Sequence, residues 1–174
     1  VGYQIGMIIE ILAQSFNVAW SPFLFEKLKE GKESVKYTIV KFTWLYMFGI
    51  VIIALVLSFL APFLLRFLVG KQFFGAYKYV IWIALGYAAS GMYYMVVNYI
   101  FFVKKTAILA WITFFAALVN IVLNYFFIKA HGAIGAAQAT TITFFVSFIL
   151  TWIASAKVYK MPWFTFLKTR NEQT

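Results

Sequence analysis

The stretch from Ile39 to Ala61, IVKFTWLYMFGIVIIALVLSFLA, decides the fold class of this chain. It has 23 residues, and Lys41 is the only charged one. An α-helix rises about 1.5 Å per residue, so about 20 apolar residues cross a hydrocarbon core about 30 Å thick. The stretch is too long for a soluble strand and too apolar all round for a surface helix. It therefore predicts a transmembrane helix.

Four further stretches have the same length and character, so we expect about five spans. Their predicted bounds are residues 3–25, 39–61, 79–103, 107–128 and 133–156, and residues 157–174 form a tail. Polar segments at Glu26–Lys36, Lys104–Thr106 and Lys129–Gly132 predict turns between spans. The alternating segments of about 10 residues that transmembrane strands need are not seen. The predicted fold is all-α, a polytopic transmembrane helix bundle.

Two prolines are expected to interrupt these helices. Pro62 should close the second span, because proline cannot extend the ladder of helical hydrogen bonds. Residues 63–78 then mix basic residues with phenylalanines, which is typical of an amphipathic segment in the membrane interface. Pro22 is expected to end or bend the first helix near its C-terminal end.

The composition excludes a soluble domain and disfavours catalysis. The 174 residues are 64% apolar and 11% charged, against about 45–50% and about 25% in soluble domains. The chain has no Cys and no Asp, and its one histidine, His131, lies in a predicted turn. No phosphate-binding glycine loop or dinucleotide fingerprint is present. We therefore expect no enzymatic activity, no cofactor and no metal site.

We interpret the formal net charge of +10 as a sign of contacts with the membrane rather than with nucleic acid. Basic residues in a membrane protein mark cytoplasmic loops and contacts with anionic lipid. One side of the predicted bundle collects 11 basic residues, namely Lys27, Lys29, Lys32, Lys36, Lys41, Lys104, Lys105, Lys157, Lys160, Lys168 and Arg170. The other side collects 4, namely Arg66, Lys71, Lys78 and Lys129. The richer side, with the C-terminal tail, is predicted to be cytoplasmic.

A polar stripe on the first span gives the main candidate site. Glu10, Gln14 and Asn17 stand at i, i+4 and i+7, within about 60° of one another on a helix. A carboxylate at the bilayer centre costs about 2.5–3.5 kcal/mol on insertion scales, so it should face protein or a water-filled cavity. We interpret the stripe as cavity-lining, with Glu10 as a candidate proton or cation coupling site. Alternatively, Glu10 lies near the outer interface and is hydrated there.

Other spans carry further candidates for the substrate path. Tyr94 and Asn98 share a face of the third span, and Asn120 and Asn124 share one on the fourth. Gln138 on the fifth span points away from the threonine and serine stripe of that helix. Such amides bind sugar hydroxyls, or else form helix–helix hydrogen bonds worth about 0.6 kcal/mol each. The sequence leaves these two interpretations equally open.

The small and hydroxylated residues of the spans are expected to serve packing. Gly86, Gly91 and Gly135 allow helices to approach closely where lipid gives no hydrophobic drive. The stripe on the fifth span comprises Thr140, Thr143, Ser147 and Thr151. Its hydroxyls can bond to carbonyls one turn earlier in the same helix.

Three segments resemble one transporter family. They are SFNVAWSPFLFEKL (Ser15 to Leu28), NYFFIKAHGAIGAAQAT (Asn124 to Thr140) and KVYKMPW (Lys157 to Trp163). They resemble polysaccharide-repeat and O-antigen flippases of the multidrug/oligosaccharidyl-lipid/polysaccharide exporter superfamily. In such proteins twelve or more helices form two lobes around a central cavity. One departure is Lys129, where the family often has proline.

The resemblance implies that the five spans correspond to the eighth to twelfth helices of such a flippase. The chain, which starts without Met, is then expected to be the C-terminal part of a longer transporter that also has an N-terminal lobe. The implied cargo is a short glycan on a polyprenyl diphosphate carrier, moved across the bacterial cytoplasmic membrane. The alternatives are a cation-coupled multidrug exporter, for which Glu10 is the one acidic residue available, and a membrane-embedded biosynthetic enzyme or scaffold.

Overall fold

The computed structural model describes residues 2–68 and 75–164, which form five helices and no strand. They are α1 (Gly2–Glu30), α2 (Glu33–Leu68), α3 (Tyr77–Phe102), α4 (Ala107–His131) and α5 (Ala133–Val158). All five are long and apolar enough to cross a membrane. The prediction of an all-α bundle of five membrane-spanning helices is therefore confirmed.

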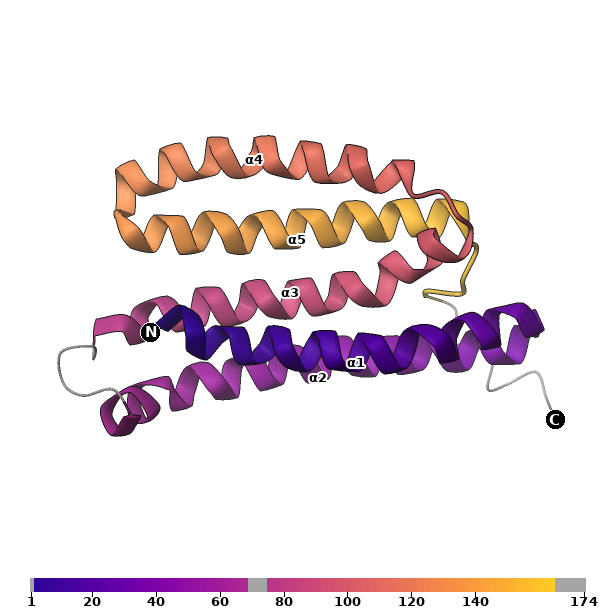
Figure 1. The fold of residues 1–174 in the computed structure, drawn as a ribbon, viewed down its shortest axis with the longest axis horizontal. Coiled ribbons are helices and arrows are strands. Elements are labelled where there is room, and N and C mark those ends of the chain that lie inside the picture. Colours follow the sequence, from indigo (N-terminus) through magenta and orange to yellow (C-terminus); the bar gives the residue numbers. More distant parts are fainter. Residues whose placement is uncertain (1, 69–74, 165–174) are drawn as a thin grey trace.

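Helix α3 is the centre of the bundle (Figure 1). It packs against α1 and α2 on one side and against α5 on the other, while α4 packs on the far side of α5. Fourteen residues of α3 are buried, whereas Ala116 is the one buried residue described in α4. Most apolar side chains of α4, such as Trp111 and Tyr125, therefore face outward, as expected of a helix in contact with lipid.

Glycines in α3 allow this central position. A Cβ built on Gly91 would lie 3.1 Å from the Cβ of Ala13 in α1 and would overlap the side chain of Ile50 in α2. A Cβ on Gly86 would lie 3.4 Å from the Cα of Thr141 in α5. Close helix approach at small residues is the packing that the sequence predicts for these positions.

The expectation that Pro62 ends the second helix is wrong, because α2 continues through Pro62 to Leu68. A proline in a helix loses one backbone hydrogen bond, and membrane helices tolerate this when packing compensates. Here Leu65, one turn beyond Pro62, is fully buried against Ile5 of α1 and Val80 of α3. Pro22 likewise lies inside α1, which continues to Glu30. Tertiary contacts therefore outweigh the local preference of proline.

The connections between the helices are short. Gly31 (φ 67°) separates α1 from α2, Lys104 (φ 59°) follows α3, and Gly132 (φ 61°) separates α4 from α5, so the three predicted turns are confirmed. The predicted interfacial segment of residues 63–78 is not a separate element. Its first part belongs to α2, residues 69–74 lie outside the described part, and α3 begins at Tyr77.

Successive helices run in opposite directions, so the basic residues gather at one end of the bundle (Figure 1). The α1–α2 turn, the α3–α4 turn and the C-terminal end of α5 lie together at that end. We call it the basic end, since nine of the eleven predicted cytoplasmic lysines and arginines belong to its described segments. Lys71, Lys168 and Arg170 lie outside the described residues.

The chain beyond α5 packs back onto the basic end as far as it is described. The indole Nε1 of Trp44 in α2 donates a hydrogen bond to the backbone oxygen of Trp163 at 3.1 Å. Trp163 is buried, and its ring meets Tyr99 of α3 and Trp152 of α5 edge to face. Residues 159–164 therefore bridge α2 and α5 instead of leaving the bundle as a free tail.

Candidate functional site

The predicted stripe of α1 meets the predicted polar face of α3. Glu10, Gln14 and Asn17 are continued one turn further by Ser21, and all four face Tyr94 and Asn98. We call these six residues the central polar group. The spacing explains the arrangement, because residues at i, i+4, i+7 and i+11 lie along one side of a helix.

Glu10 is the acceptor at one end of this group. The hydroxyl of Tyr94 donates to Glu10 Oε1 at 2.7 Å, and the side-chain amide of Gln14 donates to the same oxygen at 2.8 Å. The second carboxylate oxygen, Oε2, is buried and receives no hydrogen bond from any residue in the described part. A buried carboxylate oxygen without a donor is costly, so Oε2 marks a place for a proton, a cation or a ligand donor.

Asn98 joins the two helices at the other end of the group. Its side chain is buried, and its amide donates to Asn17 Oδ1 at 2.9 Å and to the backbone oxygen of Tyr94 at 3.0 Å. Ser21 Oγ lies within hydrogen-bond distance of Asn17 Oδ1 at 3.1 Å and of Asn98 Oδ1 at 3.2 Å. These bonds hold α1 and α3 in register.

Glu10 lies level with the middle of α3 rather than at an end of the bundle. Gly6, one turn before it, packs against Ile83 and Ala84, and Tyr94 reaches Glu10 from further along α3. These contacts bracket the midpoint of Tyr77–Phe102, which is about 19 Å from either end of that helix at 1.5 Å per residue. The position favours the cavity-lining interpretation over hydration at the outer interface.

A second polar group joins α4 to α5. The amide of Asn120 donates to Thr143 Oγ1 at 3.0 Å, and the amide of Asn124 donates to Asn120 Oδ1 at 2.9 Å. Thr143 donates in turn to the carbonyl of Ala139 in its own helix at 2.8 Å. These asparagines therefore form a helix–helix contact, one of the two interpretations that the sequence left open.

A groove of about 450 Å³ lies between α3, α4 and α5, beside the contact of Asn120 with Thr143. Ser90, Tyr93, Thr113, Asn120 and Ser147 contribute polar groups to its lining. The ring of Tyr93 meets the ring of Tyr94 edge to face, with the ring centroids 5.9 Å apart. Gln138 lies outside both groups, since its side-chain amide makes no hydrogen bond with another described residue.

Sequence reasoning missed Ser21 of the central polar group and also Tyr46, whose hydroxyl lies beside Gly91 of α3. Ser21 continues the i, i+4, i+7 pattern of the stripe and could have been found from that spacing. Tyr46 of α2 could not have been found from the sequence, because a single tyrosine in an apolar helix gives no indication of which residues it contacts. Its hydroxyl is buried without a partner among the described residues, and a Cβ on Gly91 would lie 3.1 Å from it. Within the described residues there is no cluster of three or more His, Cys, Asp or Glu that could hold a metal.

Replacing Asn98 by alanine is expected to lower the free energy of unfolding by about 1–2 kcal/mol, because it leaves a buried contact between α1 and α3 unmade. Reversible unfolding in mixed detergent micelles, followed by circular dichroism, measures the change. Gln138→Ala is the matched control, since this amide makes no hydrogen bond with the described residues, and it should change the free energy by less than about 0.5 kcal/mol. Equal effects of the two variants would contradict the role of Asn98.

Two proteins of Haemophilus influenzae are similar to this chain. One, named "Uncharacterized membrane protein", is 33% identical over 106 residues, which cover 61% of this chain and 26% of that protein. The other, named "Lsg locus putative protein 1", is 27% identical over 154 residues, which cover 84% of this chain and 38% of that protein. The chain thus spans well under half the length of these relatives.

No protein-family model matches the chain, and no solved structure matches it. The name of the first relative and the five apolar helices together identify a multi-pass membrane protein.

Proposed function

We propose that this chain is the C-terminal five-helix part of a flippase that moves lipid-linked oligosaccharides or polysaccharide repeat units across the bacterial cytoplasmic membrane. The observation that carries the proposal is Glu10, a carboxylate held at mid-span by Tyr94 and Gln14, whose second oxygen is buried and has no hydrogen-bond donor among the described residues. Ionisable groups at this depth are expensive in lipid and mark substrate or ion pathways.

The polarity of the surrounding face supports a hydrated path. Gln14 is exposed beside Glu10, and a groove lined by Tyr93, Asn120 and Thr143 provides further polar groups between α3, α4 and α5. Amide and hydroxyl groups of this kind bind sugars, whose hydroxyls both donate and accept hydrogen bonds. In the proposed protein the N-terminal lobe packs opposite this face, so that the two lobes enclose the path.

The resemblance of Ser15–Leu28, Asn124–Thr140 and Lys157–Trp163 to polysaccharide flippases supports the choice of cargo. A cation-coupled drug exporter is the weaker candidate, because Glu10 is the one acidic residue within the described spans away from the helix ends. Translocation of a lipid-linked glycan by the longest natural protein that contains this segment tests the proposal. Accumulation of the glycan on the cytoplasmic leaflet after depletion supports it, and unchanged export together with lost drug resistance would contradict it.

We expect the basic end to face the cytoplasm, because lysines and arginines concentrate in cytoplasmic loops. Single cysteines test this expectation at Ser34, beside the α1–α2 turn, and at Lys129, beside the α4–α5 turn; both residues are exposed. An impermeant thiol reagent added to intact cells should label Lys129→Cys and not Ser34→Cys. Permeabilised cells, in which both should react, provide the control. The reverse labelling would overturn the orientation.

A further inference from the structure

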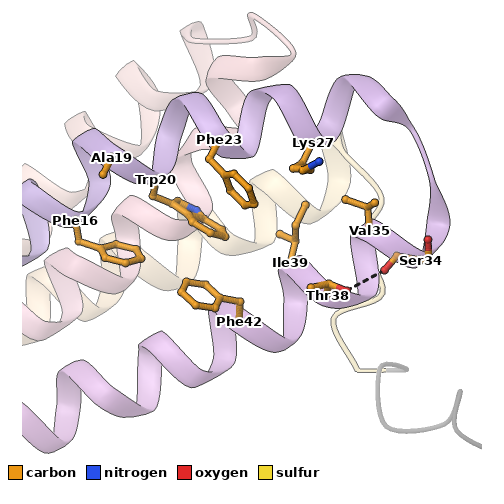
Figure 2. Close-up of a pocket in the computed structure, with 10 residues that line it drawn as sticks. All are labelled: Phe16, Ala19, Trp20, Phe23, Lys27, Ser34, Val35, Thr38, Ile39 and Phe42. Carbon is orange, nitrogen blue, oxygen red and sulfur yellow. Dashed lines mark hydrogen bonds between the residues drawn. The ribbon is translucent and has the colours of Figure 1, made fainter.

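Two adjacent faces of α2 at the basic end differ in the charge that they offer. Figure 2 shows the groove between α1 and α2, where Lys27 is the lining lysine and pairs with Glu30. On the next face of α2, a groove of about 640 Å³ is lined by Lys41. Lys41 is exposed and forms no ion pair or hydrogen bond with any described residue. Its ammonium is therefore free to meet an anion in this second groove, which we call the Lys41 groove.

The chain after α5 forms one wall of the Lys41 groove. Trp44 Nε1 donates to the backbone oxygen of Trp163, and the ring centroid of the next residue, Phe164, lies 6.4 Å from that of Trp44. The other lining residues all belong to α2, namely Thr38, Lys41, Phe42, Trp44, Leu45 and Phe48. Apart from Lys41 and Thr38 they are aromatic or aliphatic, so the groove combines one free cation with an apolar trough.

The charge pattern of α2 places Lys41 at the level of the lipid headgroups. The run from Phe42 to Leu65 has 24 residues and no charged one, and Arg66 follows it. At about 1.5 Å per residue this run is about 36 Å long, slightly more than a hydrocarbon core of about 30 Å. Lys41 and Arg66 therefore mark the two membrane interfaces. From Lys41 the groove extends about 10 Å along α2 to Phe48, into the apolar part of the leaflet at the basic end.

We propose that the Lys41 groove binds one anionic glycerophospholipid of this leaflet. Lys41 binds the phosphate, and an acyl chain lies along Leu45 and Phe48 against the ring of Phe164. The proposal does not depend on the proposed function, because every residue that lines the groove lies outside the central polar group.

The size of the side chains favours a lipid over a protein helix as the occupant. Leu45 and Phe48 continue along α2 into Ile52 and Phe59, and all four side chains are more than half exposed. Helix interfaces in membranes are enriched in small residues that let backbones approach, and this row of four has none. A partner helix or a second copy would also have to bring an acidic side chain to Lys41. A glycerophospholipid carries its anion directly next to its acyl chains.

Native mass spectrometry of the full chain, released from detergent micelles after titration with phosphatidylglycerol or phosphatidylcholine, tests the proposal. We expect one phosphatidylglycerol to bind about fivefold more tightly than phosphatidylcholine, since one lysine near an anionic lipid surface contributes about 1 kcal/mol. Lys41→Gln should abolish this preference and leave phosphatidylcholine unaffected, whereas Lys41→Arg should keep it. Phe164→Ala should weaken both lipids and leave their ratio unchanged, because it removes apolar wall and no charge.

Lys29→Gln is the matched control. Lys29 is also exposed and unpaired among the described residues, but it lies on α1 outside the Lys41 groove, so this variant should bind both lipids as the wild type does. Circular dichroism shows whether each variant remains folded. Equal binding of the two lipids by the wild type, no retained lipid, or equal losses in Lys41→Gln and Lys29→Gln would overturn the proposal. Unchanged binding by Phe164→Ala, or a stable dimer that excludes phosphatidylglycerol, would overturn it as well.

Discussion

Replacing Glu10 by glutamine is expected to lower the export of lipid-linked glycan at least about tenfold while the bundle stays folded. Glutamine keeps the shape of the side chain, and its carbonyl oxygen can still accept from Tyr94 and Gln14. The charge is lost, and with it the difference between a charge-assisted and a neutral hydrogen bond, about 1.4 kcal/mol or a factor of ten. Rates of glycan translocation in proteoliposomes of the longer protein measure the effect.

The pH dependence of export shows whether Glu10 couples proton uptake to transport or only binds the cargo. If the carboxylate takes up a proton during the transport cycle, Glu10→Gln should flatten the pH response, because the variant has no titratable group at that position. Gln14→Ala and Asn17→Ala should weaken export without altering its pH response. Glu26→Gln removes an exposed carboxylate at the basic end and is the control. Wild-type export by Glu10→Gln, Gln14→Ala and Asn17→Ala alike would mean that the group serves packing alone.

The number and type of helices could be predicted from the sequence because membrane insertion depends on local composition. A run such as Ile39–Ala61 has no soluble alternative that satisfies its backbone and buries its side chains. The three turns could also be predicted, because polar segments interrupt the apolar runs. Two of these turns contain a glycine, Gly31 or Gly132, and each of these glycines adopts a positive φ value that favours glycine. Helix ends were predicted less well. The ends of α1 and α2 depend on long-range contacts, such as Leu65 with Val80, that no local signal encodes.

The candidate site could be predicted one helix at a time. Spacing placed Glu10, Gln14 and Asn17 on one face and Tyr94 and Asn98 on another, because helical periodicity fixes both. That these faces meet follows from the packing of α1 on α3, which glycines such as Gly91 permit. Tyr46 and Trp163 reach their positions through contacts between distant segments, and a single sequence gives no signal for such contacts.

Substitution of Gly135 by alanine is expected to destabilise the α4–α5 hairpin by about 2 kcal/mol or more. Gly135 lies in the first turn of α5, three residues after Gly132. Gly132 forms the turn that joins α4 to α5, so the two helices are close together at this point. A Cβ there would overlap the backbone carbonyl of Phe127 in α4 and lie 2.8 Å from the nitrogen of Ile128. A helical backbone cannot yield as a side chain does, so the helices must separate, and overpacking of this kind costs about 1–3 kcal/mol or more.

Gly49→Ala in α2 is the matched control for this prediction. A Cβ at Gly49 meets no atom within 4 Å, so alanine should be neutral or stabilise the helix by up to about 1 kcal/mol through its higher helix propensity. The two variants make the same chemical change and should shift the midpoint of reversible unfolding in mixed micelles in opposite directions. Because α4 packs mainly on α5, separation of the two helices in the Gly135→Ala variant should also move Asn120 away from Thr143. A cysteine pair at these two positions should then cross-link less readily in the Gly135→Ala variant. Equal cross-linking with and without the substitution would show that the hairpin absorbs the extra methyl group locally.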